Sequence, residues 1–291
     1  MKPCRLKAAF PFFLGLLGIG CFYFFRLERT EVRQWSASGI TGFEARTENG
    51  SIVVSTGTDT VISARITRHA MGRDSADAAR HLDDITVTDQ VTGNRVSLRV
   101  DAPDVNTRNL GADLEIVAPE SAALQLASSN GAVAVSNAEA GLEVATSNGA
   151  IELRNCQGPI SLHTSNGAVT LTDTRGKTGL VTSNGKVRVQ FHKGSLNART
   201  SNGKMDCDVA ELGPTDSITL ITSNGWVVLA LPESAGADFD ARTSNGAVTV
   251  GGFPGVQFTA SERTHKAGRI GAGGVKVAIV SSNGDVTIQA R

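Results

Sequence analysis

The sequence predicts an all-β protein, a β-solenoid (single-stranded and β-helix-like) with coils of about 18 residues, preceded by one N-terminal transmembrane helix. Three observations predict this fold: a tripeptide repeated at a fixed period, alternating apolar residues on both sides of it, and an uncharged N-terminal run. The scarcity of aromatic residues agrees, because thin coils filled by Val, Ile, Leu, Ala and Thr need few large rings.

The repeated tripeptide is Ser-Asn-Gly, and repetition at a fixed period is the signature of solenoid architectures. Its asparagines are Asn130, Asn148, Asn166, Asn184, Asn202, Asn224, Asn245 and Asn283. The first four steps are 18 residues each, followed by steps of 22, 21 and 38. A degenerate copy, Glu48-Asn49-Gly50, lies near the start. Each copy therefore marks one coil.

Apolar residues alternate with polar ones around each copy, as in Leu142 and Val144 before Asn148 and in Ile151 and Leu153 after it. Period-two alternation predicts strands with one buried face. Each unit then holds two short strands joined by a turn that contains glycine, and stacked units lie about 4.8 Å apart. The turn glycines are Gly141, Gly158, Gly176 and Gly194.

The tripeptide itself predicts a corner between the two strands. Counting by twos points the Asn and the Thr or Ser two places before it inward, whereas counting back from the next strand points the Gly inward. Asn and Gly both tolerate the left-handed conformation that such a slip in parity can require. We expect a hydrogen-bonded ladder of the eight asparagines beside a ladder of Thr146, Thr164, Thr182, Thr200 and Thr222, both with a structural role.

The N-terminal run predicts a membrane anchor. Lys2, Arg5 and Lys7 precede eighteen uncharged residues, Ala8–Phe25, which can just span a bilayer as a helix. Basic residues before the span favour a cytoplasmic N-terminus, and a body that lies in the periplasm or on the cell surface. Cleaved secretion and a lipoprotein site at Cys21 are the alternatives.

Three regions follow from these patterns: a stub and anchor over 1–29, a β region over 30–118, and the repeat solenoid over 119–291. The middle region contains one predicted helix, Ser75–Leu82, with Asp74 as its cap. This middle region is placed to cover the exposed strand edge of the first coil. Residues 251–280 are predicted to form an excursion that returns for the last strand. Ile221, Trp226 and Val228 are expected to face outward, where this excursion covers them or a partner binds them.

These features together resemble a bacterial family of unknown function whose members are called "putative adhesins". The resemblance covers about residues 38 to 291. It depends on the eight Ser-Asn-Gly copies and on Glu48-Asn49-Gly50-Ser51-Ile52-Val53-Val54, Ala112-Asp113-Leu114-Glu115-Ile116-Val117-Ala118-Pro119 and Gly268-Arg269-Ile270-Gly271-Ala272-Gly273-Gly274. It implies a β-helix-like fold, a location in the cell envelope and no catalytic residues.

Motifs of catalysis are not found in the sequence, so we expect no enzyme, no cofactor and no metal site. Gly176-Lys177-Thr178 lacks the first glycine of a phosphate loop. Five histidines lack metal spacing and are expected to be solvated: His69, His81, His163, His192 and His265. Cys156 and Cys207 are expected to be structural and unpaired. A polysaccharide-active β-helix is the enzymatic rival, with Asp206 and Asp208 as its only near pair of carboxylates.

A cluster of basic residues is the candidate binding feature. Between Thr174 and Met205 the sequence has no acidic residue but contains Arg175, Lys177, Lys186, Arg188, Lys193, Arg199 and Lys204. Adjacent coils would gather them into a band for anionic envelope polymers or lipid headgroups, with Lys186 above Lys204. We therefore expect a non-catalytic adhesin or envelope scaffold. The alternative is a sensory ectodomain with a protein partner; with 28 basic and 28 acidic residues, nucleic acid is not expected.

Overall fold

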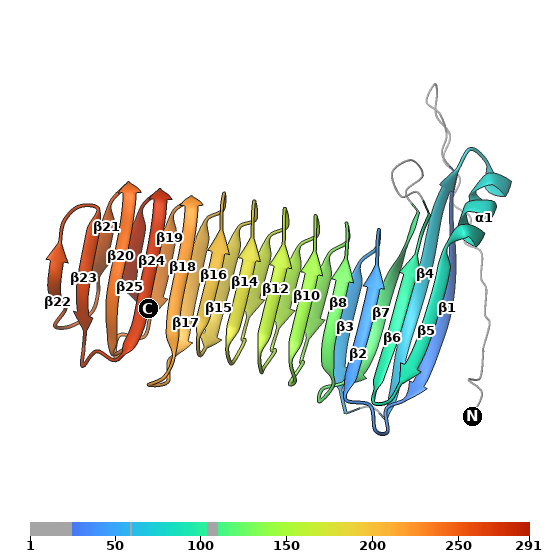
Figure 1. The fold of residues 1–291 in the computed structure, drawn as a ribbon, viewed down its shortest axis with the longest axis horizontal. Coiled ribbons are helices and arrows are strands. Elements are labelled where there is room, and N and C mark those ends of the chain that lie inside the picture. Colours follow the sequence, from blue (N-terminus) through green and yellow to red (C-terminus); the bar gives the residue numbers. More distant parts are fainter. Residues whose placement is uncertain (1–24, 59, 104–109) are drawn as a thin grey trace.

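The computed structural model describes residues 25–58, 60–103 and 110–291, and these form an elongated solenoid of two facing sheets with the helix α1 (Ser75–Asp84) at one end (Figure 1). The predicted membrane span Ala8–Phe25 lies outside these residues except for Phe25, which begins β1. No helix in the described part of the chain is long and apolar enough to cross a membrane.

Twelve strands form the first sheet. In spatial order they are β1 (Phe25–Ser36), β4 (Val61–Gly72), β7 (Gly111–Pro119), β3 (Ile52–Gly57), β9 (Val133–Ser136), β11 (Ile151–Arg154), β13 (Val169–Thr172), β15 (Val187–Lys193), β17 (Met205–Glu211), β19 (Val227–Leu231), β25 (Val286–Ala290) and β21 (Val248–Gly251).

Thirteen strands form the second sheet. In spatial order they are β22 (Gln257–Ser261), β23 (His265–Ile270), β20 (Ala237–Asn245), β24 (Val275–Asn283), β18 (Ser217–Asn224), β16 (Leu196–Thr200), β14 (Thr178–Thr182), β12 (Ile160–Thr164), β10 (Leu142–Thr146), β8 (Ala123–Ser128), β2 (Gly42–Thr47), β6 (Arg95–Asp101) and β5 (Thr86–Thr92).

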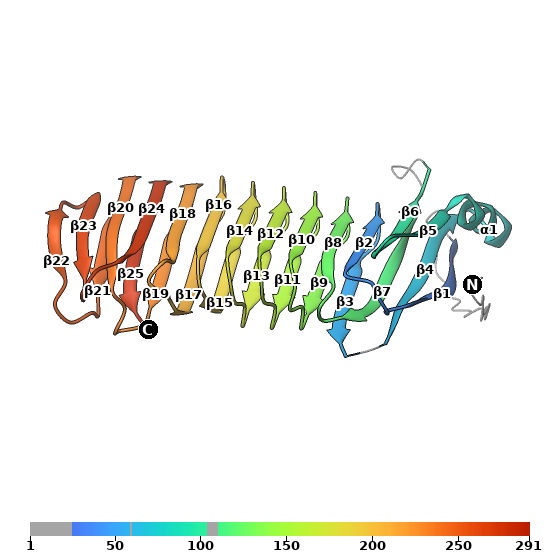
Figure 2. The same cartoon turned by 60° about the horizontal axis from the view of Figure 1, so that its bottom comes forward.

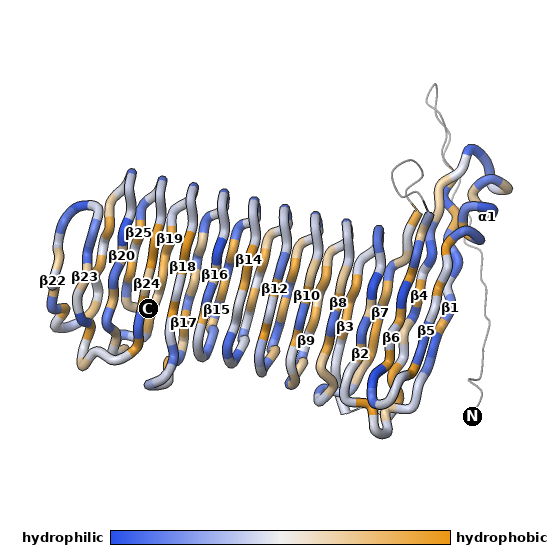
Figure 3. Tube along the Cα trace, in the orientation of Figure 1, coloured by the Kyte–Doolittle hydropathy of each residue, from blue (hydrophilic) through white to orange (hydrophobic). Residues whose placement is uncertain are grey.

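Each central coil supplies one strand to each sheet, in parallel, and the register is kept except where the end of β15 pairs with β17. Leu142 of β10 pairs with Ile160 of β12, which pairs with Thr178 of β14. Alternate side chains are buried between the sheets, and hydrophobic stretches lie along the strands while most turns are pale or blue (Figure 3). The structure therefore confirms the predicted all-β fold with its parallel stacking of coils.

The region before the repeats continues the two sheets and closes their first edge. Thr47 of β2 pairs with Ser128 of β8, so both sheets run without a break across the boundary expected between 118 and 119. Antiparallel strands β1 and β5 form the outermost edges, and α1 packs against β4 and β1 (Figure 2). The helix begins as predicted, because the Asp74 carboxylate accepts a hydrogen bond from the backbone N–H of Asp77 at 2.8 Å.

The far end differs from the expectation of a simple excursion. Strand β24 inserts between β18 and β20, and β25 inserts between β19 and β21. The β22–β23 hairpin then extends the second sheet beyond β20 and does not fold over β18. Ile221, Trp226 and Val228 are therefore not covered by this segment, and each is half-buried by its own neighbours.

Candidate binding surfaces

The edge where each second-sheet strand turns through Ser-Asn-Gly into the first sheet carries a chain of side-chain amides; we name it the SNG edge. Asn148 Nδ2 donates to Asn130 Oδ1 at 2.7 Å, and Asn166 Nδ2 donates to Asn148 Oδ1 at the same distance. The bonds run in the spatial order Asn49, Asn130, Asn148, Asn166, Asn184, Asn202, Asn224, Asn283 and Asn245. The structure thus links all eight predicted asparagines and adds Asn49.

Two details of the predicted corner were wrong. The asparagine side chains are exposed and do not point inward, and neither Asn148 nor Gly149 has a positive φ. The glycine is needed for another reason: a Cβ on Gly149 would lie 1.8 Å from the carbonyl oxygen of Gly131 in the next coil. Close approach of stacked backbones therefore requires glycine at this corner.

The buried threonines bond to backbone and not to one another, which corrects the expected threonine ladder. Thr164 Oγ1 donates to the Gly149 carbonyl oxygen of the neighbouring coil at 3.1 Å and accepts from the Gly167 N–H at 3.1 Å. Thr146 makes the same pair of bonds with Gly131 and Gly149. Each hydroxyl thereby satisfies polar groups that the corner would otherwise bury unpaired.

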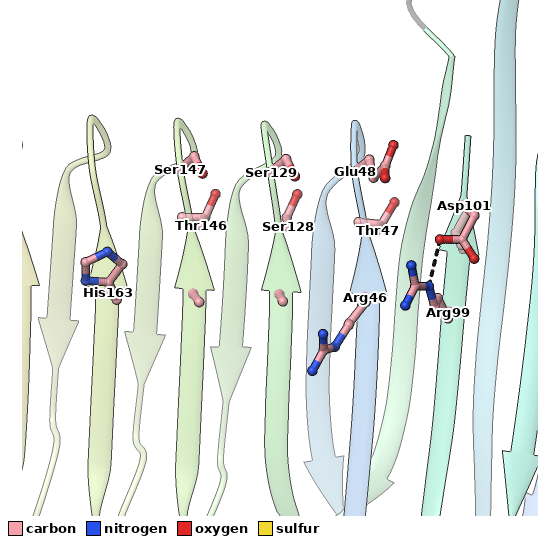
Figure 4. Close-up of a pocket in the computed structure, with 13 residues that line it drawn as sticks. Arg46, Thr47, Glu48, Arg99, Asp101, Ser128, Ser129, Thr146, Ser147 and His163 are labelled. Atoms are coloured by element: carbon pink, nitrogen blue, oxygen red, sulfur yellow. Dashed lines mark hydrogen bonds and ion pairs between the residues drawn. The ribbon is translucent and has the colours of Figure 1, made fainter. Parts of the chain in front are cut away.

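A shallow groove of about 280 Å³ lies on the outer face of the second sheet beside the SNG edge (Figure 4). Its floor is the small residues Ala127 and Ala145, which stand in the same row as the long side chains of Arg46 and His163. The groove exists because two alanines separate those longer side chains. It crosses β6, β2, β8, β10 and β12, so it runs along the solenoid axis.

Cations and hydroxyls line this groove. The Arg99 guanidinium bonds the Asp101 carboxylate at 2.7 Å, which raises the pKa of Arg99, and Arg46 bonds Glu44 at 2.8 Å. The hydroxyls of Ser129 and Ser147, one from each of two neighbouring coils, stand at the rim (Figure 4). Sequence analysis missed this groove, because Arg46 and Arg99 are brought beside β8 only by the pairing of β2 and β6.

The predicted basic band is spread over both edges and both faces. Arg199 lies on the second sheet, Arg188 on the first, and Arg175 and Lys193 stack at the edge opposite the SNG edge. Acids of the coil that contains β17 partner three of them: Glu211 lies 3.6 Å from Arg175 and 3.4 Å from Lys193, and Asp206 lies 3.8 Å from Arg188. Both acids follow Met205, outside the acid-free stretch, although the 18-residue step places Asp206 beside Arg188 and Glu211 beside Lys193.

The remaining lysines of the band have different surroundings. Lys186 and Lys204 precede the paired residues Val187 and Met205, so they are vertical neighbours, as predicted. Lys204 Nζ lies 5.3 Å from the centroid of the Trp226 ring. Lys177, Lys186 and Arg199 have no ion-pair partner within residues 25–58, 60–103 and 110–291. This part of the chain has unpaired positive charge, but not on one continuous surface.

A second hollow, of about 310 Å³, lies at the edge where first-sheet strands turn back to the second sheet; we name it the opposite edge. It is lined by Asn155, Gln157, Asp173, Thr174, Arg175, Phe191 and Lys193. Phe191 is 44% exposed. Its φ of 55° lies in the left-handed region, which a bulky side chain rarely adopts. Phe191 stands 18 residues after Asp173 and 36 after Asn155, so the repeat could have shown a ring where earlier coils carry Asn or Asp.

Buried titratable groups occur at several points, against the expectation of solvated histidines. His69, His81 and His192 are buried, and only His163 and His265 have substantial exposure. Burial lowers the pKa of His192, whose Nδ1 lies 2.9 Å from Thr174 Oγ1, and burial also lowers the pKa of His69 against the Asp113 carboxylate. Such groups favour their neutral form.

Cys156 and Cys207 are buried free thiols whose pKa values are raised by burial. Both are core residues, including Cys156, which lies at a turn. Within the described residues no three His, Cys, Asp or Glu side chains are grouped so that they could hold a metal ion.

Comparison with known proteins matches residues 11–289 to the family described as Toastrack DUF4097, in agreement with the resemblance to a family of unknown function. A "putative adhesin" from Bacteroides fragilis NCTC 9343 is 14% identical with a TM-score of 0.49, covering 89% of this chain and 96% of that chain. A "putative lipid binding protein" from Parabacteroides distasonis ATCC 8503 is 11% identical with a TM-score of 0.40 and the same coverage of 89% and 96%. No curated protein matches the chain.

Proposed function

The chain belongs to the Toastrack DUF4097 family, and we propose that it is a non-catalytic, adhesin-like binding module of the cell envelope that holds a glycan strand along its solenoid axis. In this proposal residues 8–25 anchor the chain in the membrane and the solenoid lies outside the cytoplasm. The ligand is a linear envelope polymer that carries hydroxyl and acidic groups.

The observation that carries this proposal is the direction of the groove in Figure 4. It crosses five neighbouring strands and is open to solvent, so a ligand that fills it lies along the axis and meets equivalent positions coil after coil. Coils stack about 4.8 Å apart, so a polymer with repeated hydroxyl groups can reach Ser129 and Ser147 in succession. Arg46 and Arg99 supply donors for acidic groups.

A non-catalytic role is supported by the chemistry of the groove. Two carboxylates line it, Glu48 and Asp101. The Arg99 guanidinium holds Asp101 at 2.7 Å, so this acid is tied as an acceptor and is not poised to form a general acid and base pair with Glu48. Asp206 and Asp208, the carboxylate pair noted in the sequence, face Arg188 and Arg291 instead. An active polysaccharide hydrolase or lyase would release shorter chains, and we expect none.

The test is binding of the full chain, in detergent micelles, to purified cell-wall glycan strands and acidic polysaccharides at low and moderate salt. The double variant Arg46→Ala/Arg99→Ala should weaken binding about tenfold or more, since two charge-assisted contacts are lost. Arg242→Ala is the matched control, because Arg242 bonds Asp240 at 2.7 Å and has the same 58% exposure as Arg46.

The basic residues are tested in the same assay. Replacing Lys186, Arg188, Lys193, Arg199 and Lys204 by Gln should remove salt-sensitive binding to vesicles that contain anionic lipid, if these residues contact anionic polymers or headgroups. Equal binding by the wild type, by the Arg46→Ala/Arg99→Ala variant and by the variant with five basic residues replaced would contradict the proposal. Capture of a protein alone, with no polymer bound, would favour the sensory ectodomain.

A further inference from the structure

The hollow at the opposite edge is built from two columns of side chains contributed by three successive coils. One column is Asn155, Asp173 and Phe191, and the other is Gln157, Arg175 and Lys193. Between them the chain turns inward at each coil, so that buried Thr174 forms the floor. The volume of about 310 Å³ falls at the lower end of the range of small-ligand sites, about 300–1,000 Å³.

Phe191 has a left-handed backbone conformation. The polar residues at the same place in earlier coils tolerate this conformation, whereas a phenylalanine does not. Asn137, Asn155 and Asp173 have φ values of 63°, 51° and 52°, and Asn and Asp are the side chains that tolerate this region. Phe191 adopts a φ of 55° beside a shift in register between β15 and β17. A bulky ring in this conformation is strained, and such strain concentrates at functional sites.

The ring is held out from the solenoid and partly fixed in place. The Arg291 guanidinium lies 5.2 Å from the ring centroid and also pairs with Asp208 at 3.2 Å. Arg291 does not line the hollow, and the ring remains 44% exposed while it borders that space. An aromatic surface is therefore presented to whatever enters.

Planar polar groups surround this aromatic surface, and their charges balance. Arg175 and Lys193 share the Glu211 carboxylate at 3.6 and 3.4 Å. The Asp173 carboxylate has no side-chain partner among the described residues, so it can accept hydrogen bonds from a ligand. With two cations and two carboxylates, the hollow has no preference for a strongly charged ligand.

We propose that this hollow is a saccharide-binding site in which the Phe191 ring packs against the apolar C–H face of a neutral sugar ring, while Asp173, Asn155 and Arg175 bond its hydroxyls. A sugar ring combines an apolar face with a rim of hydroxyl groups, which is the combination that these side chains match. The ligand class rests on the proposed function, but the site is separate, since the groove of Figure 4 lies at the SNG edge.

The test measures binding of N-acetylglucosamine tetramer and maltotetraose to the full chain by calorimetry and by saturation-transfer NMR. Phe191→Asn should weaken binding about tenfold or more, because it removes the ring. The same variant should keep or raise the melting temperature, because Asn137 and Asn155 adopt this conformation in the same column, so lost binding is not lost folding. Phe191→Trp should retain binding.

Phe258→Ala is the matched control, because Phe258 is a similarly exposed ring, at 43%, with Lys266 Nζ 5.3 Å from its centroid. It should leave binding unchanged. Unchanged binding by Phe191→Asn, or no binding of either saccharide by the wild type, would overturn the proposal. Polymer binding that depends on Arg46 and Arg99 but not on Phe191 would leave the proposed function standing and remove this site alone.

Discussion

Along the SNG edge the asparagine ladder runs through every coil, whereas along the opposite edge coils differ in length and in side chains. The coil from Asn202 to Asn224 has 22 residues, and its additional residues lie at the opposite edge between β17 and β18. At the SNG edge stacked backbones come too close for a Cβ, as at Gly149 and Gly167. The opposite edge also requires glycine, since a Cβ on Gly176 would lie 2.5 Å from the Gly158 carbonyl oxygen, but the positions before that glycine differ from coil to coil and are the ones that carry binding groups.

The largest expected effect comes from adding a methyl group at the SNG edge. Gly167→Ala places a Cβ 1.7 Å from the Gly149 carbonyl oxygen, and backbone atoms of a stacked coil cannot move away individually. We expect a loss of about 3 kcal/mol or more in the free energy of unfolding, measured by chemical denaturation.

Gly179→Ala is the control for this change, because the nearest atom to its added Cβ is the Ile160 carbonyl oxygen at 3.9 Å. Its backbone is not left-handed, so we expect little change or a gain of about 0.4–1 kcal/mol. Equal losses in both variants would show that close approach is not what requires glycine at the SNG edge.

A smaller effect is expected from Thr164→Val, which keeps the side-chain shape and removes the hydroxyl. The Gly149 carbonyl oxygen and the Gly167 N–H then lose their partner in a buried corner. The expected loss is about 1–3 kcal/mol. Thr164→Ser retains the hydroxyl, as Ser128 does in its own coil, and should recover most of the stability in the same denaturation experiment.

Breaking the amide ladder should cost less, because its side chains are exposed. Asn166→Ala removes bonds to Asn148 and Asn184, both of 2.7 Å. We expect a loss of about 1 kcal/mol and a lower melting temperature. The matched change at the opposite edge, Gln157→Ala, removes one amide bond of 3.3 Å to Glu139 and should lower the melting temperature less. An unchanged melt for Asn166→Ala would contradict a structural role for the ladder.

The smallest effect near neutral pH concerns His192, which lies at the opposite edge. Burial lowers its pKa in the folded state, an effect that the Asp216 carboxylate partly opposes. The folded chain therefore binds fewer protons than the unfolded chain, whose histidines titrate near 6.5. The stability contributed by neutral His192 is complete above about pH 6.5 and is lost as the pH falls below it. His192→Gln should reduce the slope of the free energy of unfolding against pH between pH 7 and pH 5. An unchanged slope would contradict this role of His192.

Much of the fold was predictable because the chain repeats one local pattern. The alternation around Asn148, the corner at Ser-Asn-Gly and the cap at Asp74 each follow from short-range preferences of strands, turns and helices. The family resemblance followed from the same motifs. The direction of the Asn148 side chain was mispredicted, because counting along a strand gives no account of where the chain leaves the strand.

The sequence by itself determined the all-β class, the 18-residue coil and the inward-facing apolar residues, because these depend on neighbours two to eighteen positions away. Only the tertiary structure decided that β24 enters between β18 and β20, that Arg46 lies beside Ala127 of β8, and that Arg99 lies beside Arg46. Those contacts join segments whose separation follows no period. Stacking therefore sets the surface chemistry, while the repeat sets the scaffold.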